Sequence, residues 1–293
     1  MIQGNIMFKK GVITDEISQD FKIAVDLAMK YKLDGVEIRS IWEKGPHELD
    51  ISDINKINSI LSSTNLEVCG ISAPFYKCDV DNMTEVKANI ELLKRSIDLA
   101  HRTGAKIIRG FTFWKKGDFE ENLNKIVSRF EEPIHILERE GLTLALELDP
   151  SVYASNAKKL VRVIEAINSP LVKALWDPGN DIYEPDEEIP YPNGYEIIKK
   201  YMVHMHLKDA IKQKDGKIIG VPIGEGQVDY KGHFNELIKS GYSGYVVLET
   251  HYRPKSAISE ELLTLPKGSA FSYLGYDATE ECLRKWEKLL ESI

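Results

Sequence analysis

Four side chains that can bind a metal or move a proton end apolar runs in the second half of the chain. The runs read LALE, ALWD, VHMH and VVLE, and their last residues are Glu147, Asp177, His206 and Glu249. A carboxylate or an imidazole is costly to bury without a partner, so four such endings call for one explanation. They lie 30, 29 and 43 residues apart, close to one strand–helix unit each. We therefore expect them to meet at one end of a repeating α/β fold.

The convergence of these four residues would create an electrostatic problem that a cation solves. Three carboxylates that meet without a positive charge repel one another, and the repulsion raises their pKa values. A bound divalent metal is the simplest way to keep them ionised. Three oxygens and one imidazole nitrogen suit Mn²⁺, Co²⁺, Mg²⁺ or Zn²⁺, and the ligand types do not choose among these ions. We predict one divalent metal ion held by the quartet Glu147, Asp177, His206 and Glu249.

The stretch MVHMHLKDA places a second histidine, His204, two residues before His206. Successive side chains on a strand point to opposite faces, so the two imidazoles would share a face. A pair of buried, hydrogen-bonded histidines is the alternative to a metal site. With His206 as the ligand, His204 is expected one layer deeper in the barrel, as a core or hydrogen-bonding histidine. A contact with substrate is the other role open to His204.

The elements that must position these residues follow from two alternating periodicities. Short β-type runs alternate with longer helical patterns along the chain. Strands are predicted at residues 11–14, 34–39, 66–72, 105–111, 142–148, 172–176, 202–207 and 245–249. Helices are predicted at residues 20–30, 51–62, 86–102, 121–140, 157–167, 195–200, 231–239 and 279–290.

Eight such units indicate a closed barrel. Runs such as KALW and YVVL are almost continuously apolar, which is typical of parallel strands buried on both faces. We predict an α/β fold with a single (β/α)8 TIM barrel that forms one domain over residues 1–293. A doubly wound open sheet is the alternative, but it leaves the last two strands hard to place.

Composition excludes several classes of partner. The 293 residues carry a net charge of −8 without a lysine or arginine tract, so we expect no nucleic-acid partner. No apolar run could span a membrane and no signal-peptide pattern opens the chain, so we expect no membrane partner and a cytoplasmic location. Cys69, Cys78 and Cys282 match no metal or disulfide spacing and are expected to be reduced. The oligomeric state, a homo-oligomer included, stays open.

Several motifs resemble those of one superfamily. LELD (146–149), WDPGN (176–180), HMHLKD (204–209), GEGQVD (224–229) and VVLET (246–250) are similar to motifs of the xylose isomerase-like TIM-barrel superfamily, in its sugar phosphate isomerase/epimerase branch. TDEI (14–17) and LDGVEIR (33–39) extend the resemblance over nearly the whole chain. It implies a barrel with the same quartet as ligands of one divalent metal, Mn²⁺ being favoured.

The resemblance also implies a reaction and a small-molecule carbohydrate substrate. In similar ketose epimerases two glutamates exchange protons with the substrate, which assigns acid–base roles to Glu147 and Glu249, with metal ligation alone as the alternative. The implied activity is that of a metal-dependent isomerase or epimerase of a keto sugar, inosose or sugar phosphate, by proton transfer next to a polarised carbonyl. The alternative is a lyase, resembling inosose or dehydroshikimate dehydratases or a C-glycoside deglycosidase subunit. A metal-holding binding protein without turnover is the alternative outside enzymes. The acidic balance and the single clear histidine ligand disfavour a DNA-repair endonuclease.

The motifs point to Asn180 and Lys208 as candidate substrate-binding residues. Asn180 stands where the ketose 3-epimerases carry a substrate-binding histidine, and Lys212 stands where they carry an arginine. These departures weaken an assignment as a 3-epimerase. Lys208, two residues past the histidine ligand, could reach a hydroxyl or phosphate group, or it could lie in a solvated loop.

Two further candidates lie at the ends of earlier strands. Arg39 could bind an anionic group of the substrate, although pairing with Glu37 or Asp15 is slightly favoured. Trp114, which follows the fourth predicted strand, could form an apolar wall for a sugar ring or belong to the packing.

Overall fold

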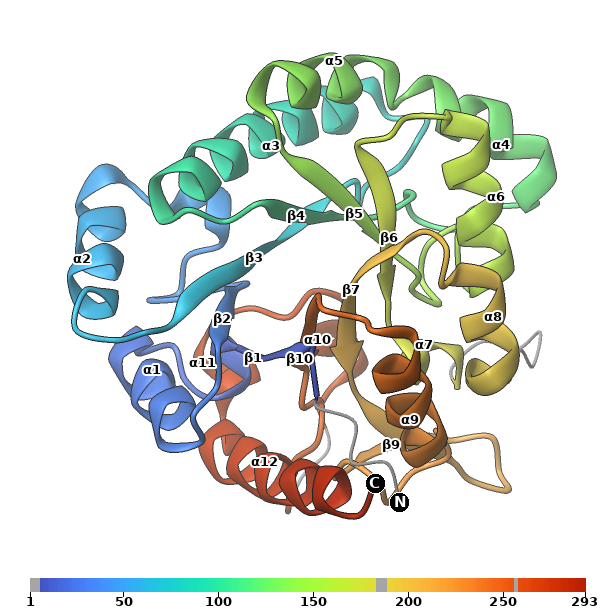
Figure 1. Ribbon diagram of the computed structural model, residues 1–293. Helices are drawn as coiled ribbons and strands as arrows, with labels where there is room; N and C mark the ends of the chain where they lie inside the picture. Colours follow the sequence, from blue (N-terminus) through green and yellow to red (C-terminus); the bar gives the residue numbers. More distant parts are fainter. Residues whose placement is uncertain (1–5, 183–188, 256–257) are drawn as a thin grey trace.

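The computed structural model describes residues 6–182, 189–255 and 258–293. Within this part, eight parallel strands close into a barrel in the order β1-β10-β7-β6-β5-β4-β3-β2 (Figure 1). The barrel strands are β1 (Lys9–Ile13), β2 (Gly35–Ile38), β3 (Glu67–Phe75), β4 (Ile107–Gly110), β5 (Thr143–Glu147), β6 (Val172–Trp176), β7 (Met202–Leu207) and β10 (Tyr245–Leu248). The predicted single (β/α)8 barrel is confirmed. The predicted domain extent, 1–293, includes residues outside the described part and stays a prediction.

Helices surround the barrel and connect its strands (Figure 1). They are α1 (Phe21–Lys30), α2 (Ile51–Leu61), α3 (Met83–Thr103), α4 (Phe119–Ser128), α5 (Glu131–Glu140), α6 (Ala157–Ile167), α7 (Pro178–Asp181), α8 (Tyr195–Ile198), α9 (Tyr230–Ser240), α10 (Glu260–Thr264), α11 (Gly268–Ser272) and α12 (Gly275–Glu291). Short helical turns lie at η1 (Thr14–Glu16), η2 (Pro46–Glu48) and η3 (Pro190–Gly194).

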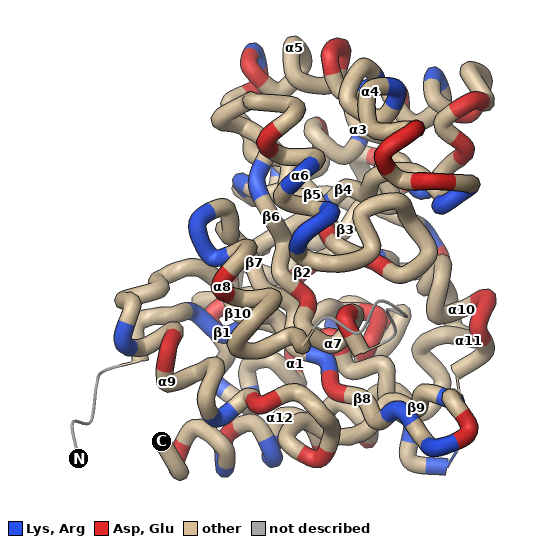
Figure 2. The backbone as a smooth tube through the Cα atoms, turned by 90° about the vertical axis from the view of Figure 1, so that its right-hand side faces the viewer, with Lys and Arg blue, Asp and Glu red and all other residues tan. Residues whose placement is uncertain are grey.

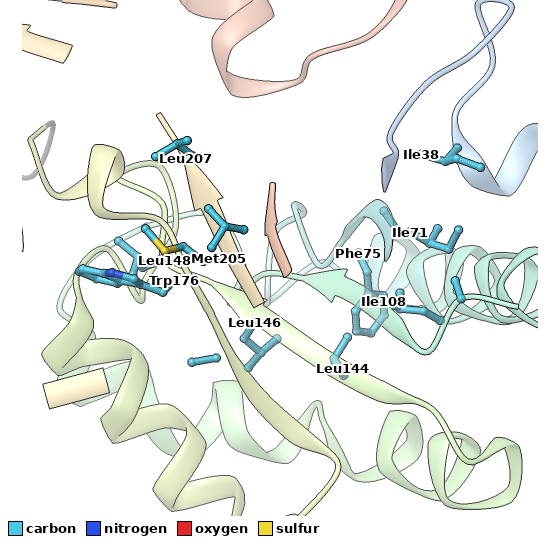
Figure 3. Packing of buried hydrophobic residues seen from close by; sticks show 14 of the residues in the cluster. Ile38, Ile71, Phe75, Ile108, Leu144, Leu146, Leu148, Trp176, Met205 and Leu207 are labelled. Atoms are coloured by element: carbon cyan, nitrogen blue, oxygen red, sulfur yellow. The ribbon is translucent and has the colours of Figure 1, made fainter. Parts of the chain in front are cut away.

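The alternation of side chains along the strands separates the core from the barrel interior. On β5, Leu144 and Leu146 belong to the large apolar cluster, and Met205 and Leu207 do so on β7 (Figure 3). Residues of the other parity therefore face the barrel axis. The inward-facing residues include every member of the predicted metal quartet. Because the leucines and the methionine pack outward, their neighbours along the strand must point into the barrel.

The helix predicted over 121–140 is two helices in the structure. Pro133 lacks an N–H, and its ring would clash with the carbonyl of residue 129, so a continuous helix is unfavourable there. The Arg129 carbonyl instead accepts a hydrogen bond from the Tyr76 hydroxyl at 2.6 Å. The buried Phe130 lies at the break and packs edge-on against Tyr76 and Phe113. The break therefore results from one proline and one buried aromatic anchor.

A hairpin of β8 (Asp209–Lys212) and β9 (Ile218–Val221) follows strand β7. This hairpin was not predicted. Buried Asp209 holds its return loop by accepting the backbone N–H groups of Gly224 and Gly226 at 3.0 and 2.9 Å. A Cβ atom at position 226 would lie 1.9 Å from an Asp209 carboxylate oxygen, which explains the glycine. The motif GEGQVD thus shapes a loop beside the barrel mouth.

The charged positions and the cysteines of the structure can be compared with the expectations from composition. Basic and acidic positions are both scattered along the chain in the view of Figure 2. Cys69, Cys78 and Cys282 are buried and free of disulfides. No helix in the described ranges is both long and apolar enough to cross a membrane.

Candidate metal centre and active site

The predicted quartet converges at the end of the barrel where the strands have their carboxyl termini. Glu147, Asp177, His206 and Glu249 each offer a ligand atom, and these atoms lie within 4.8 Å of one another. The His206 Nδ1 atom is 3.2 Å from Glu147 Oε1 and 3.6 Å from Glu249 Oε2. All four residues are buried. Strands β5, β6, β7 and β10 therefore bring together three carboxylates and one imidazole, as the spacing predicted.

The orientation of Asp177 tests whether the quartet fits a cation. Its Oδ1 atom caps α7 by accepting the backbone N–H groups of Gly179 and Asn180 at 2.9 and 3.2 Å. Its buried Oδ2 atom lies 2.7 Å from Lys208 Nζ but has no hydrogen bond of good geometry to any described residue. A buried carboxylate oxygen left in this way beside three other ligand atoms fits a divalent cation.

Basic side chains already neutralise part of the negative charge. Lys208 Nζ lies 2.8 Å from Glu249 Oε2, and Arg39 also donates a hydrogen bond to Glu249. Arg109 Nη1 donates a hydrogen bond of 3.1 Å to Glu147 Oε2. Although burial opposes ionisation, Lys208 in particular holds the pKa of Glu249 well below its usual range. Glu249 is therefore a carboxylate at neutral pH.

A buried carboxylate, Glu37, connects the two histidines. Its Oε2 atom is 2.6 Å from His204 Nε2, and its Oε1 atom is 3.1 Å from His206 Nε2. Burial would lower the pKa of His206, but Glu37 and Glu147 together raise it well above its usual range. A hydrogen bond from the His206 Nε2–H to Glu37 directs Nδ1 toward the quartet, an arrangement that orients metal-binding histidines in other proteins. His204 and His206 do share one face, as predicted.

The predicted substrate-binding residues divide into two groups. Asn180 and Lys208 line a cavity of about 920 Å³ above the quartet. Lys208 is buried, so the solvated-loop alternative for this residue is wrong. His204, Arg39 and Trp114 are not among the described residues that line the cavity. A substrate-binding role for each of the five stays a prediction, but the geometry favours Asn180 and Lys208.

The structure gives Arg39 and Trp114 other surroundings. Arg39 is buried and pairs with Asp15 at 2.9 Å, one of the partners expected from the sequence, and also with Glu16 at 2.7 Å. The Trp114 ring lies 5.7 Å from the ammonium group of Lys77. Arg39 therefore acts on the site through the carboxylates that it holds.

Sequence reasoning missed several residues of the site. Arg109, Lys77 and His251 line the cavity, and Lys77 Nζ pairs with Asp149 Oδ2 at 2.8 Å. Arg109 is a charged residue within the apolar run IIRGF. A charged or polar residue in an apolar run is also the kind of signal that identified the quartet. His251 has a left-handed φ of 41°, unusual for a residue other than glycine, and nothing in the sequence indicates it.

Metal binding is expected to strengthen as the pH rises. Burial, opposed by Lys208 and aided by repulsion from Glu249, raises the pKa of Asp177 to about 7. Below this pH a metal must displace a proton from Asp177, and His206, whose pKa is raised well above its usual range, must also give up its Nδ1 proton. Affinity for Mn²⁺ should therefore increase by about tenfold per pH unit for each proton released. Calorimetry in two buffers, from about pH 6 to about pH 8, measures both affinity and proton release. An affinity independent of pH would contradict this assignment.

Removal of the Lys208 ammonium group is expected to tighten metal binding. The group lies 2.7 Å from Asp177 and 2.8 Å from Glu249, so it competes with a cation for the same oxygens. Lys208→Met should lower the Kd for Mn²⁺ by about tenfold, since two buried carboxylates lose a partner. Lys77→Met is the matched control, because Lys77 lines the same cavity but pairs with Asp149. Unchanged or weaker binding in Lys208→Met would exclude such competition.

Comparison with known proteins places the chain among related barrels. A model of the family described as xylose isomerase-like TIM barrel matches residues 25–268. The L-ribulose-5-phosphate 3-epimerase UlaE of Escherichia coli K12 is 26% identical over 163 residues, which are 55% of this chain and 55% of that protein. The chain thus matches about half the length of this curated relative.

Solved structures agree over nearly the full length, at low identity. The IolI protein with a bound zinc atom has a TM-score of 0.74 and 17% identity, with 97% of this chain and 99% of that chain covered. The probable 3-DHS dehydratase AsbF from Bacillus anthracis has a TM-score of 0.72 and 16% identity, with 96% and 99% covered. At this level of sequence identity, the structural similarity shows the fold alone.

Proposed function

Because the chain belongs to the xylose isomerase-like TIM barrel family, we propose that it is an isomerase or epimerase of a keto sugar, an inosose or a sugar phosphate. One observation carries the proposal: four buried residues offer ligand atoms within 4.8 Å of one another, and two of these residues, Glu147 and Glu249, line a cavity of about 920 Å³. The relative named as an epimerase supports it.

The quartet Glu147, Asp177, His206 and Glu249 would hold one divalent metal ion. When bound, such an ion polarises a carbonyl group, which makes the neighbouring C–H bond more acidic. The structural neighbour IolI holds a zinc atom, and Mn²⁺ remains our proposal for this chain.

Two glutamates would exchange protons with the substrate. Glu147 and Glu249 both line the cavity, and β6 and β7 lie between their strands, so the two carboxylates approach it from different sides. Arg109 and Lys208 hold the two carboxylates in place. Glu249, whose pKa is well below its usual range, can accept a proton at neutral pH. Glu147 is the second acid–base group.

The test of this function is exchange of hydrogen for deuterium. Metal-loaded protein is incubated in D2O with L-ribulose 5-phosphate, free L-ribulose and an inosose, and NMR follows the C–H groups beside the carbonyl. We expect metal-dependent incorporation of deuterium into at least one of these ketones. Release of water from the substrate would instead identify the lyase alternative. No reaction with any of them in the presence of metal would count against the proposed function.

A further inference from the structure

The cavity above the quartet has two chemically different halves. Its floor is polar and contains Glu147, Asn180, Lys208 and Glu249. The rest of the lining includes β9, α10 and the chain beside these elements, which also contribute Lys217, Glu260 and Thr264. Its aliphatic residues are Ile218, Ile219, Val221, Ile258, Leu263 and Pro266.

Most of this aliphatic wall does not belong to the protein core. In the part of the chain that the structure describes, Ile218 packs against the large apolar cluster, whereas Ile219, Val221, Ile258 and Leu263 do not. These four side chains are half-buried and line the cavity. Apolar surface that faces a cavity instead of the core is available to an apolar group of a ligand.

The charges of the cavity make a phosphate group a poor match for this half. The buried cations that line it are already paired: Lys77 with Asp149 at 2.8 Å, and Arg109 with Glu147 at 3.1 Å. Arg253 lies 3.5 Å from Glu16 Oε2 and donates its N–H groups to the backbone carbonyls of residues 252, 271 and 273. Lys217 also lines the cavity but is exposed. A phosphate beside the aliphatic wall would therefore lose hydration and meet only cations that are already paired or exposed to solvent.

Size points in the same direction. Binding pockets for drug-sized ligands have volumes of about 300–1,000 Å³. At about 920 Å³ the cavity lies near the upper end of this range and exceeds what a pentose or hexose fills. A sugar seated on the quartet would leave the aliphatic half empty.

We propose that the substrate is a keto sugar that carries a bulky apolar substituent, such as an aryl or alkyl glycoside. The sugar lies on the quartet, and the substituent lies against Ile219, Val221, Ile258 and Leu263. This inference rests on the proposed function for its sugar half and on the aliphatic wall for the rest. If the wall served only to exclude water, a larger substituent would bring no advantage.

A matched pair of ligands tests the subsite. Calorimetry compares methyl and phenyl 3-keto-β-D-glucopyranoside as ligands of the Mn²⁺-loaded protein. The phenyl glycoside should bind about tenfold more tightly or better, since burial of an aromatic ring adds that much affinity. Equal affinity of the two glycosides, or no binding of either, would overturn the proposal.

Two variants of one segment locate the effect. Leu263→Ser should reduce the preference for phenyl over methyl severalfold. Leu265→Ser is the matched control, because Leu265 is 48% exposed and does not line the cavity. An equal preference for phenyl over methyl in the two variants would show that the substituent does not bind at Leu263.

The outcome is separable from that of the proposed function. Deuterium exchange is measured on the same two glycosides. A calorimetric preference for phenyl without exchange into any ketone would keep the subsite and reject the isomerase. Deuterium exchange without a calorimetric preference for phenyl would support the isomerase and reject the subsite.

Discussion

The His206→Ala protein is expected to retain less than about one tenth of the divalent metal held by the unmodified protein, since loss of one of four ligands weakens a metal site severely. His206 Nδ1 is the only nitrogen within the quartet, 3.2 Å from the nearest Glu147 oxygen. Without the imidazole, three carboxylates remain, and Lys208 becomes a stronger competitor for them. Elemental analysis after Mn²⁺ loading and dialysis measures the retained metal.

His204→Ala is the matched control for this experiment. His204 is equally buried, lies on the same strand and contacts the same Glu37 carboxylate, but it lies outside the quartet. Its variant should keep most of the metal. Thermal unfolding of both variants without metal separates loss of a ligand from loss of the fold. Equal metal content in His206→Ala and the unmodified protein would exclude the site as described.

The sequence predicted the barrel and the quartet because both depend on local patterns. A parallel strand buried on both faces is apolar throughout, so a charge at its end is conspicuous, as in LALE and VVLE. The repeat of strand and helix then places these ends at one mouth. The fold and the convergence of these four residues could therefore be predicted without any knowledge of which side chains touch.

The contacts that tune the site depend on pairings across the barrel. Glu37 is 167 positions from His204 and meets it only because the strands close around a common interior. Arg39 and Glu249, 210 positions apart, meet in the same way. The aliphatic wall arises from strand β9, the short helix α10 and the chain beside α10, which lack a clear periodicity. Such features follow from tertiary packing, which periodicity does not encode.

The largest loss of activity is expected in the Glu147→Gln and Glu249→Gln proteins. In D2O, each should exchange the hydrogen beside the substrate carbonyl at least about a hundredfold more slowly than the unmodified protein, because general-base catalysis contributes a factor of that size or more. Glutamine keeps an oxygen ligand and nearly the same volume but cannot accept the proton. Metal binding should therefore weaken far less than exchange.

The two variants need not lose exchange in the same way. Glu147 and Glu249 come from strands separated by β6 and β7, so each can serve one side of the substrate. One epimer would then still exchange in one variant and the other epimer in the second. Asp149→Asn is the control, because this half-buried carboxylate lines the cavity but pairs with Lys77. Conversion of substrate to an isomer without deuterium incorporation would indicate hydride transfer, and it would reject proton transfer by the two glutamates.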